Sequence, residues 1–556
     1  MTRGDVITLL EEYATLLGLL DEDEFRAKAF ANAARQLESV GASLEELLIG
    51  DRLAMVRGIG PAVALAIREA AYGGTFADLE SVRHRVPAGV LDLMRVDGLG
   101  PKKARTLWRD AGVDSLMALE RAIHEGRLAK VSGFGGKTLD KFRASLEFLK
   151  TIGERRLRHH AHTAADTLRD DIMLIPGVEF VYFCGSLRRN CETSGDLDCI
   201  VCAEREAHAA VKEVLARIEG ITWENRDGDI WQGRERAGMQ VELSVCGPQE
   251  LGTRLVLATG SKEHVAALRQ RGEIINAATE AEVYAALGLA FVPPPLRESG
   301  LVLRSSADGD YPLPVLRSDL RGILHVHTTY SDGQHTLRQM AEAMMTRGYE
   351  FLGICDHSQV AAYARGLSPD RVHQQWDEID ELNSELAPFR ILKGTECDIL
   401  PDGRMDFDDL LLSRFDFVVA SIHSGFQMTM EAATERLCGA LRNPHVDMLG
   451  HPTGRLLLKR EGYPIDHEAV LRCAAEHGKA VELNSSPHRL DLDWRWLGRA
   501  IELGVPIPLN PDAHAANGLD EITYGLELAA KGPLPPALCP STWSAAEFLN
   551  WCQSHD

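Results

Sequence analysis

The stretch LHVHTTYSDG, residues 324–333, joins a short apolar run to two histidines and an aspartate. Successive side chains of a strand alternate between its two faces, so His325 and His327 would point to the same side of a strand beginning at Leu324. Asp332 follows in a Ser-Asp-Gly turn. The pattern predicts one wall of a metal site, but two surface histidines beside a turn would produce the same ten residues.

Imidazole and carboxylate side chains recur after apolar runs through the rest of the C-terminal half. Five further segments each read as a buried strand with one or two ligand-type residues at its end. They are FLGICDHS, KGTECD, VVASIHS, DMLGHP and IPLNPDAH. Amphipathic stretches such as TLRQMAEAMM predict helices between them. In an α/β barrel the catalytic groups stand at the carboxyl ends of the strands. We therefore expect a metal cluster built from His325, His327, Asp332, His357, Glu396, His423, His451, Asp512 and His514.

This series of motifs resembles the polymerase-and-histidinol-phosphatase (PHP) domain, a distorted (β/α)7-type barrel of phosphoesterases. The motifs are HxHTxxSDG, DH, a strand-end Glu, SxHS, GHP and DAH. The resemblance runs from about residue 321 to about residue 519. It implies three ions, Mn²⁺ or Zn²⁺, on imidazole and carboxylate ligands. The first would lie on His325, His327, Glu396 and Asp512, the second on Glu396, His423 and His451, and the third on Asp332, His357 and His514. Candidate phosphate contacts are Arg365, Arg455 and Arg489.

The middle of the chain carries a second carboxylate pattern. The apolar run VEFVYF leads into a Gly-Ser turn, and Asp196 and Asp198 alternate around Leu197 on a following strand, so both carboxylates share one face. Such a pair can hold Mg²⁺ or Mn²⁺ at a nucleoside triphosphate. The pattern is typical of a nucleotidyltransferase, with an acidic edge strand of an α+β domain as the alternative. The expected nucleotide contacts are Gly185, Ser186, Arg188 and Arg189.

Together with three later segments, this pattern resembles the bacterial family X DNA polymerases. The segments are MQVELSVC, ATGSKEHVAALRQRG and VYAALGLAFVPPPLRE. In that family the third catalytic carboxylate is an aspartate. The matching position here is Glu242, whose side chain is one methylene longer. Because catalytic geometry tolerates little misplacement, the resemblance leaves nucleotide transfer by this chain an open question.

Three phrases repeat near the N-terminus: VRGIGPAVALAIREA, VDGLGPKKARTLWRDAG and VSGFGGKTLDKFRASLE. Each couples two glycines to an amphipathic helix and resembles the helix-hairpin-helix motif. The glycines allow a tight turn and leave N–H groups at a helix N-terminus, which suits a DNA phosphate. An all-α domain whose helices are merely capped by glycine is the alternative. The expected DNA contacts are Gly58, Gly60, Gly98, Gly100, Lys102, Lys103, Gly133, Gly135 and Lys137.

Composition limits the class of protein. The chain has 556 residues, 45% of them apolar, with no apolar run long enough to span a membrane. Eleven cysteines scattered along the chain favour a reducing compartment. The net charge of −22 argues against a nucleic-acid partner unless the acidic groups gather at metal sites. We expect a helix-hairpin-helix region over residues 1–150, a nucleotidyltransferase palm and thumb over 151–298, a linker over 299–318 and a PHP barrel over 319–556.

These patterns together predict a monomeric, cytoplasmic, nucleoid-associated DNA-repair enzyme that acts on gapped, nicked or 3′-ended DNA. The C-terminal barrel would supply a metal-dependent 3′–5′ exonuclease, and the palm would fill gaps with deoxynucleoside triphosphates if Glu242 supports transfer. Two alternatives stay open. One is a non-catalytic binder of DNA ends with a degenerate polymerase core, and the other is a small-molecule phosphoesterase.

Overall fold

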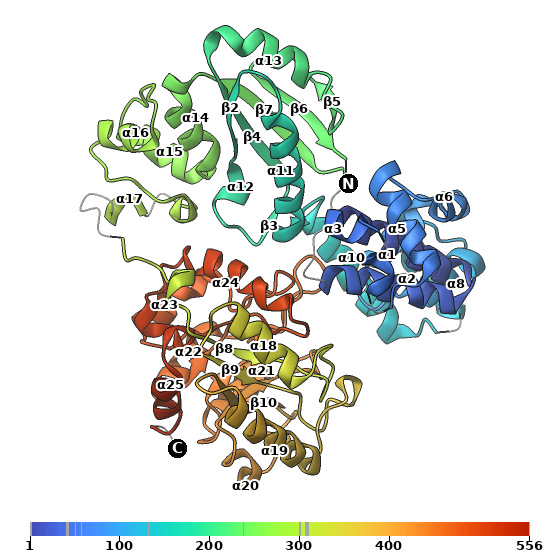
Figure 1. Cartoon of the computed structure of the whole chain (residues 1–556), viewed down its shortest axis with the longest axis vertical. Coiled ribbons are helices and arrows are strands. Elements are labelled where there is room, and N and C mark those ends of the chain that lie inside the picture. Colours follow the sequence, from blue (N-terminus) through green and yellow to red (C-terminus); the bar gives the residue numbers. More distant parts are fainter. Residues whose placement is uncertain are drawn as a thin grey trace. The chain divides into compact units, whose positions relative to one another are not determined.

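The computed structural model describes residues 3–39, 44–50, 52–56, 58–131, 133–236, 238–299, 302–305 and 311–554. The chain forms two compact units, residues 1–153 with 458–461 and residues 154–457 with 462–556 (Figure 1). Part of the expected linker, residues 300–301 and 306–310, lies outside the described residues. Among the described helices none combines the length and the apolar character that a membrane span needs. All eleven cysteines are free, and ten of them are buried.

The first unit is helical. Its core is apolar and includes a triangle of aromatic rings from Tyr13, Phe30 and Phe76, with centroids 4.6–5.9 Å apart. Its helices are α1 (Arg3–Leu20), α2 (Glu24–Ser39), α3 (Leu44–Leu48), α4 (Arg52–Met55), α5 (Pro61–Gly73), α6 (Ala77–Arg83), α7 (Ala88–Asp92), α8 (Pro101–Ala111), α9 (Leu116–His124) and α10 (Gly136–Ile152).

The three predicted glycine hairpins are present in this unit. In each of them the first glycine has a positive φ, between 78° and 92°, which only glycine adopts readily. The second glycine is the extended N-cap residue of α5, α8 or α10. The turn therefore leaves the first N–H groups of each helix without an intrahelical partner. The glycine pairs are Gly58 and Gly60, Gly98 and Gly100, and Gly133 and Gly135.

The second unit begins with a mixed five-stranded sheet in the order β2-β4-β7-β6-β5. Strands β4 and β7 are parallel and the other neighbours are antiparallel. Helix α11 (Arg158–Met173) packs along the sheet, as the central green region of Figure 1 shows. The strands are β2 (Val178–Phe183), β4 (Asp196–Ala203), β5 (Ile221–Asn225), β6 (Ile230–Glu235) and β7 (Gln240–Cys246), with a separate short pair, β1 (Arg156–Leu157) and β3 (Thr193–Ser194).

Short helices surround this sheet and follow it. A small core around the buried Tyr284 holds the helices that come after β7. They are α14 (Leu251–Thr259), α15 (Lys262–Arg271), α16 (Glu280–Ala286) and α17 (Val302–Ser305), while α12 (Gly185–Arg188) and α13 (His208–Leu215) lie between strands in the sequence.

The C-terminal part is a curled parallel sheet in the order β13-β12-β11-β10-β9-β8. Strands β14 and β15 form a further parallel pair, and a bridge between Val326 and Ala513 brings the chain after β15 back beside β8. The expected distorted barrel is thus confirmed. Its strands are β8 (Gly322–Val326), β9 (Phe351–Ile354), β10 (Arg390–Asp398), β11 (Phe417–Ser421), β12 (Met448–Leu449), β13 (Ala480–Val481), β14 (Leu483–Asn484) and β15 (Leu509–Asn510).

Helices surround the barrel strands. Strands β8, β9 and β11 are buried along their whole length, which explains why they read as unbroken apolar runs. Side-chain caps begin many of the helices and set where each crossover starts, as Thr336, Thr429 and Asp466 do. The helices are α18 (Leu337–Thr346), α19 (Pro369–Glu385), α20 (Asp409–Leu412), α21 (Met430–Leu441), α22 (His467–Glu476), α23 (Leu497–Glu502), α24 (Ile522–Ala529) and α25 (Ala545–Cys552).

Candidate functional site

The nine ligand-type residues predicted from the sequence meet at the carboxyl ends of the barrel strands. Glu396 lies at their centre, on β10, and is 1% exposed. Its Oε1 atom lies 2.9 Å from His451 Nε2 and 3.2 Å from His423 Nε2. Its Oε2 atom lies 3.0 Å from His357 Nδ1 and 3.5 Å from His325 Nε2. Side chains far apart in the sequence therefore converge on one carboxylate.

Three groups of ligand atoms lie within 4.8 Å of one another in the described part of the chain, and all three belong to this cluster. They differ in part from the groups that the family resemblance implied. His327 is added to the group that was expected to contain Asp332, His357 and His514. His357 takes the place of His451 in the group with Glu396 and His423. The groups are His327, Asp332, His357 and His514; His325, His327 and Asp512; and His357, Glu396 and His423.

Several atoms that face the centre of the cluster have no hydrogen-bond partner among the described residues. They are the Nε2 atom of His325, the Nδ1 atoms of His327 and His357, and both carboxylate oxygens of Glu396. A buried polar atom left unpaired costs about 1–3 kcal/mol, so several of them at one point favour a site built around cations. The mixed imidazole and carboxylate set suits Mn²⁺, Zn²⁺ or Fe²⁺.

Electrostatics in the cluster are strongly coupled. Burial opposes charge on the imidazole of His423, but the carboxylates of Glu396 and Asp398 outweigh it and raise its pKa to about 10. The pKa of His514 is raised in the same way to about 9, mainly by Asp332. Burial and two neighbouring imidazoles lower the pKa of His327 to about 4. Burial opposes charge on His325 too, but the carboxylates around it, Glu482 above all, hold its pKa well above the ordinary value. A metal ion entering the cluster would therefore displace protons from three of these imidazoles.

The cluster is buried except on one side, where the side chains of Asp332 and His514 are 32% and 36% exposed. Both belong to the same group of ligand atoms, together with His327 and His357. The imidazole of His514 lies 3.3 Å from the Asp332 carboxylate, through its Nε2 atom. Solvent and substrate therefore reach the cluster most directly at this group.

Sequence reasoning missed a further acidic residue of the cluster, Glu482. Glu482 is fully buried, and its Oε2 atom accepts a hydrogen bond from His325 Nδ1 at 2.6 Å. It also accepts from Asn484, Asn510 and the backbone N–H of His451. A carboxylate behind an imidazole fixes the ring and its tautomer for metal binding. Glu482 directly follows the apolar pair of β13, so the strand-end pattern used for the other ligands would have found it.

Another missed residue, Asp356, shapes the turn that carries Asp332. It is 2% exposed and accepts hydrogen bonds from the backbone N–H and the hydroxyl of Thr328, at 2.8 and 2.6 Å. Ser331 and Gln375 also donate to it. The aspartate in the CDHS motif therefore holds the TTYSD turn, while the histidine beside it faces the cluster.

The three arginines expected to contact phosphate lie in different surroundings. Arg489 lies beside the cluster, with its Nε atom 3.5 Å from Asp512 Oδ2. Arg365 is exposed on the loop after β9. Arg455 fits a phosphate contact least, because its guanidinium donates to Asp493 at 2.9 Å, to two backbone carbonyls and to Glu192.

The palm carboxylates lie on neighbouring parallel strands. Register pairs Asp198 on β4 with Glu242 on β7, and Asp196 lies two residues earlier on the same face of β4. Gly185 is needed here, because a Cβ atom at this position would lie 1.7 Å from Asp198 Oδ2. Burial, Asp196 and Glu242 together raise the pKa of Asp198 to about 7. A carboxyl group kept partly protonated by its acidic neighbours gains from a cation placed among them.

Residues of the PHP part hold the turn that follows Gly185 and Ser186. Lys531, which is 5% exposed, donates to the Arg189 carbonyl and to Glu298, each at 2.6 Å. Arg189 pairs in turn with Glu298, at 3.2 Å. The other expected nucleotide contact, Arg188, makes two hydrogen bonds to Glu280. Both arginines therefore already have acidic partners.

The turn is anchored a second time through Arg158, which is 2% exposed. Its guanidinium donates to Glu527 on α24 of the PHP part at 2.5 Å and to the carbonyl of Leu187 at 2.9 Å. Asn190 donates to the carbonyl of Glu527 at 2.8 Å. The turn that was expected to contact the nucleotide thus shares buried polar contacts with the PHP part.

The expected DNA contacts of the first unit are mostly open to solvent. Lys102 and Lys137 are exposed at the starts of α8 and α10. Lys103 instead donates to the carbonyl of Gly98 at 3.1 Å, so its ammonium group stabilises the hairpin itself. Two of the three lysines and the hairpin N–H groups are therefore free to meet a phosphate.

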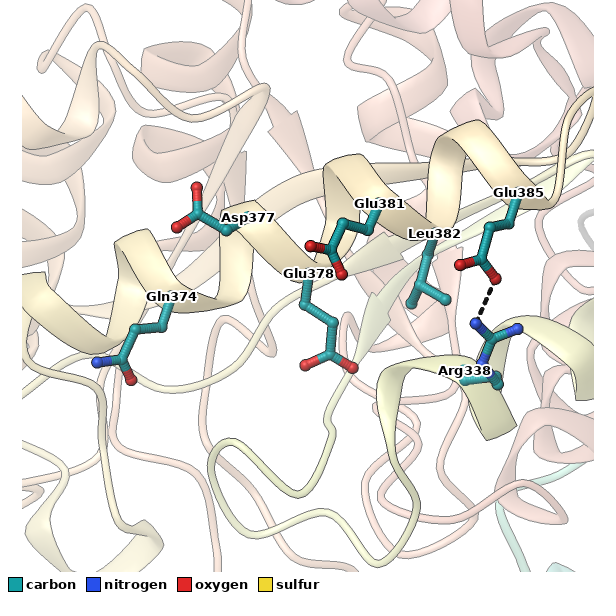
Figure 2. Close-up of a pocket in the computed structure, with 7 residues that line it drawn as sticks. All are labelled: Arg338, Gln374, Asp377, Glu378, Glu381, Leu382 and Glu385. Atoms are coloured by element: carbon teal, nitrogen blue, oxygen red, sulfur yellow. Dashed lines mark hydrogen bonds and ion pairs between the residues drawn. The ribbon is translucent and has the colours of Figure 1, made fainter.

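A pocket on the barrel lies outside the cluster. It is formed between α18 and α19, where Arg338 pairs with Glu385 (Figure 2). None of the nine ligands lines it. Its other charged residues, Asp377, Glu378 and Glu381, are acidic, so it would repel a phosphate.

Comparisons with known proteins agree with this geometry. Three family models match: a helix-hairpin-helix domain at residues 1–76, a SAM-like helix-hairpin-helix tandem at residues 90–147 and a PHP domain at residues 324–486. A probable phosphatase of Caldanaerobacter subterraneus is 29% identical over 240 residues, 41% of this chain and 89% of its own length. A probable phosphatase of Acetivibrio thermocellus is 34% identical over 165 residues, 29% of this chain and 64% of its own.

One relative matches almost the whole chain. The DNA polymerase/3′-5′ exonuclease PolX of Bacillus subtilis is 36% identical over 553 residues, which is 96% of each protein. The match spans the hairpins, the sheet that carries the three carboxylates and the barrel that carries the nine ligand-type residues. The chain therefore belongs to the bacterial family X DNA polymerases that carry a C-terminal PHP domain.

Proposed function

We propose that this chain is a DNA-repair enzyme whose PHP barrel hydrolyses phosphodiesters at 3′ ends, in the 3′–5′ direction. The observation that carries the proposal is the convergence of nine imidazole and carboxylate ligands with buried, unpaired atoms facing one another. The name of the B. subtilis relative, a DNA polymerase and 3′-5′ exonuclease, supports the same activity. The PHP relatives named as phosphatases support phosphoester hydrolysis by this barrel.

The nine side chains would hold the cations, and Glu396 is central to the set because histidines lie beside both of its carboxylate oxygens. Divalent cations bound there would lower the pKa of a water molecule and neutralise the charge of the phosphodiester. Glu482 holds His325 in the orientation that presents Nε2 to the cluster. Arg489, beside Asp512, is placed to pair with a phosphate oxygen on the same side. The other walls exclude bulk water, because most of the ligands are buried.

The helix-hairpin-helix repeats would hold the DNA backbone without reading its sequence. Their N–H groups and the exposed Lys102 and Lys137 supply local positive potential. The overall charge of −22 does not oppose this, because residues 1–150 carry 21 Lys and Arg against 22 Asp and Glu, so nearly all of the excess acidity lies in the rest of the chain. Binding through backbone contacts alone suits a repair enzyme that meets gaps in any sequence.

The palm is proposed to add nucleotides to gapped DNA, using Asp196, Asp198 and Glu242 to hold Mg²⁺ or Mn²⁺ at a deoxynucleoside triphosphate. The register of Glu242 opposite Asp198 supports this role. The extra methylene of Glu242 favours slow transfer, since misplacing a group by about 1 Å can reduce a rate roughly 100-fold. A palm retained only as a DNA clamp is the second candidate, favoured by the acidic partners of Arg188 and Arg189.

The nuclease proposal is tested with purified His325→Ala and Glu396→Ala variants on 3′-recessed DNA with Mn²⁺ and with Mg²⁺. Both variants should lose trimming, because each removes a central donor of the cluster. His373→Ala is the matched control, since this histidine lies on the outer helix α19. Unchanged trimming by the two cluster variants would refute the assignment.

A comparison of substrates tests the small-molecule alternative. The same enzyme is given 3′-recessed DNA and a phosphomonoester metabolite at equal concentration. We expect faster turnover of the DNA, because three hairpins would add binding energy that a metabolite cannot use. Preferred hydrolysis of the phosphomonoester would favour a small-molecule phosphoesterase.

A further inference from the structure

One exposed aromatic ring stands beside the PHP cluster. Tyr363 is 69% exposed, and its ring centroid lies 6.1 Å from that of His357 and 6.3 Å from that of His423. Those two imidazoles are only 6% and 10% exposed, so the tyrosine lies on their solvent side. A single exposed aromatic is ordinary on a protein surface. This one differs because it borders two proposed metal ligands.

The loop that carries Tyr363 is held at both ends. The Leu367 N–H donates to the His357 carbonyl at 2.8 Å, and the Val360 N–H donates to the Asp406 carboxylate at 2.8 Å. Buried side chains fill the space beneath the loop, namely Ala361, Ala364 and Leu367. The ring is thus presented by a fixed backbone, which reduces the entropy lost when a ligand is bound.

Tyr363 contacts the two imidazoles through its ring but is not fixed through its polar end. Its hydroxyl makes no hydrogen bond within the described part of the chain, whereas the hydroxyl of Tyr330 donates to Glu378. Arg365, two residues further along, is also exposed. A flat ring beside a cluster proposed to bind a phosphodiester matches the parts of a nucleotide, which joins a flat base to a charged phosphate.

We propose that Tyr363 stacks on the base of the 3′-terminal nucleotide while the adjoining phosphodiester lies at the cluster. This inference rests on the proposed 3′–5′ exonuclease function and adds a residue that recognises the substrate. Stacking accepts every base, because each base has a π-face, so it suits an enzyme that trims ends of any sequence. Tyr363 is therefore a substrate-positioning residue, and it holds no metal.

The test compares kcat/KM for two DNA substrates with wild-type enzyme, Tyr363→Ala and Tyr363→Phe. One substrate ends in a normal 3′ nucleotide, and the other ends in an abasic nucleotide with the same sugar and phosphate. On normal DNA the alanine variant should lose about 5- to 150-fold, the range that stacking one base on an aromatic ring supplies. The phenylalanine variant should keep the wild-type value, because its ring can still stack.

The abasic end separates stacking from other roles. The wild-type enzyme should lose a similar factor on it, and Tyr363→Ala should lose little more, since the partner of the ring is already gone. Leu410→Ala, which truncates an exposed side chain on α20, is the control and should leave both values unchanged. Mn²⁺ binding by each variant, measured by calorimetry, shows that the cluster is intact.

The outcomes are distinguishable. Equal losses by Tyr363→Ala on both substrates, or no loss on either, would overturn the stacking role and leave the exonuclease assignment standing. A loss in Tyr363→Phe equal to that in the alanine variant would assign the effect to the hydroxyl and would also overturn it. A wild-type enzyme that hydrolyses neither substrate would refute the exonuclease function and this inference with it.

Discussion

Replacing Glu482 by glutamine tests whether the barrel is built for metal ions. The carboxylate accepts four hydrogen bonds: from His325 Nδ1 at 2.6 Å and Asn510 at 3.0 Å on one oxygen, and from Asn484 at 2.8 Å and the His451 N–H at 3.3 Å on the other. A glutamine has one acceptor oxygen, so in either orientation its NH₂ group faces two donors. The substitution keeps the volume of the side chain and removes its charge.

The substitution should weaken metal binding and also lower the stability of the fold. Loss of a partner behind a metal-binding histidine typically weakens metal affinity about 10- to 100-fold. That corresponds to roughly 1.4–2.8 kcal/mol of binding free energy. The donors left facing the glutamine NH₂ group would also lower the free energy of unfolding by about 1–3 kcal/mol. Only the weaker metal affinity makes the trimming rate depend on the Mn²⁺ concentration.

The assay follows the initial rate of 3′ trimming as Mn²⁺ is raised, together with direct calorimetric titration of the full chain. Glu482→Gln should need about 10- to 100-fold more Mn²⁺ for half its maximal rate and should approach the wild-type rate at saturation. Glu476→Gln, an exposed neighbour on α22, is the control. A half-saturating concentration within twofold of the wild type would refute the reasoning.

Three further predictions follow from the same structure. Glu242→Asp should speed extension of a primer at a one-nucleotide gap at least tenfold, because a shorter carboxylate suits the two-metal site better; no extension by either form would favour the clamp. Mn²⁺ binding at pH 7 should release protons, because the raised pKa values of His423 and His514 keep both imidazoles protonated. For the same reason the affinity of the enzyme for Mn²⁺ should rise with pH up to about 9–10. Calorimetry in buffers of different ionisation enthalpy measures the release, and a buffer-independent heat would contradict it. Lys531→Ala should lower the free energy of unfolding by about 1–3 kcal/mol, because it removes a buried donor from the Arg189 carbonyl and leaves Glu298 with Arg189 as its cationic partner. A denaturation curve matching the wild type would count against this.

Much of the fold and of the candidate site follows from local sequence. A buried parallel strand reads as an apolar run, and ligand-type residues at its end must lie at one rim of the barrel. That reasoning predicted that His325, Glu396 and His451 would meet, although about 70 residues separate the first two and 55 the second two. Glycine pairs before amphipathic helices predicted the hairpins for a similar reason, because the tight turn needs glycine locally.

Other features could not be read from the chain because they depend on distant partners. Arg455 looked like a phosphate contact, yet its guanidinium is occupied by Asp493 and by Glu192 of the palm. The partners of Glu482 come from four strand ends. Tyr363 is a candidate substrate contact only because two imidazoles of the cluster lie beside its ring. No local pattern encodes such contacts.

The amino-acid sequence by itself determined which chemical groups this protein carries, the strands and helices that bear them and the family to which they belong. Only the tertiary structure decided which ligand-type residues lie together, which of the expected arginines already have acidic partners and which exposed aromatic ring lies beside the cluster. The physical reason is that the type and period of side chains are properties of a short segment. Distances of 3 Å between segments are set by the curvature and register of the whole barrel.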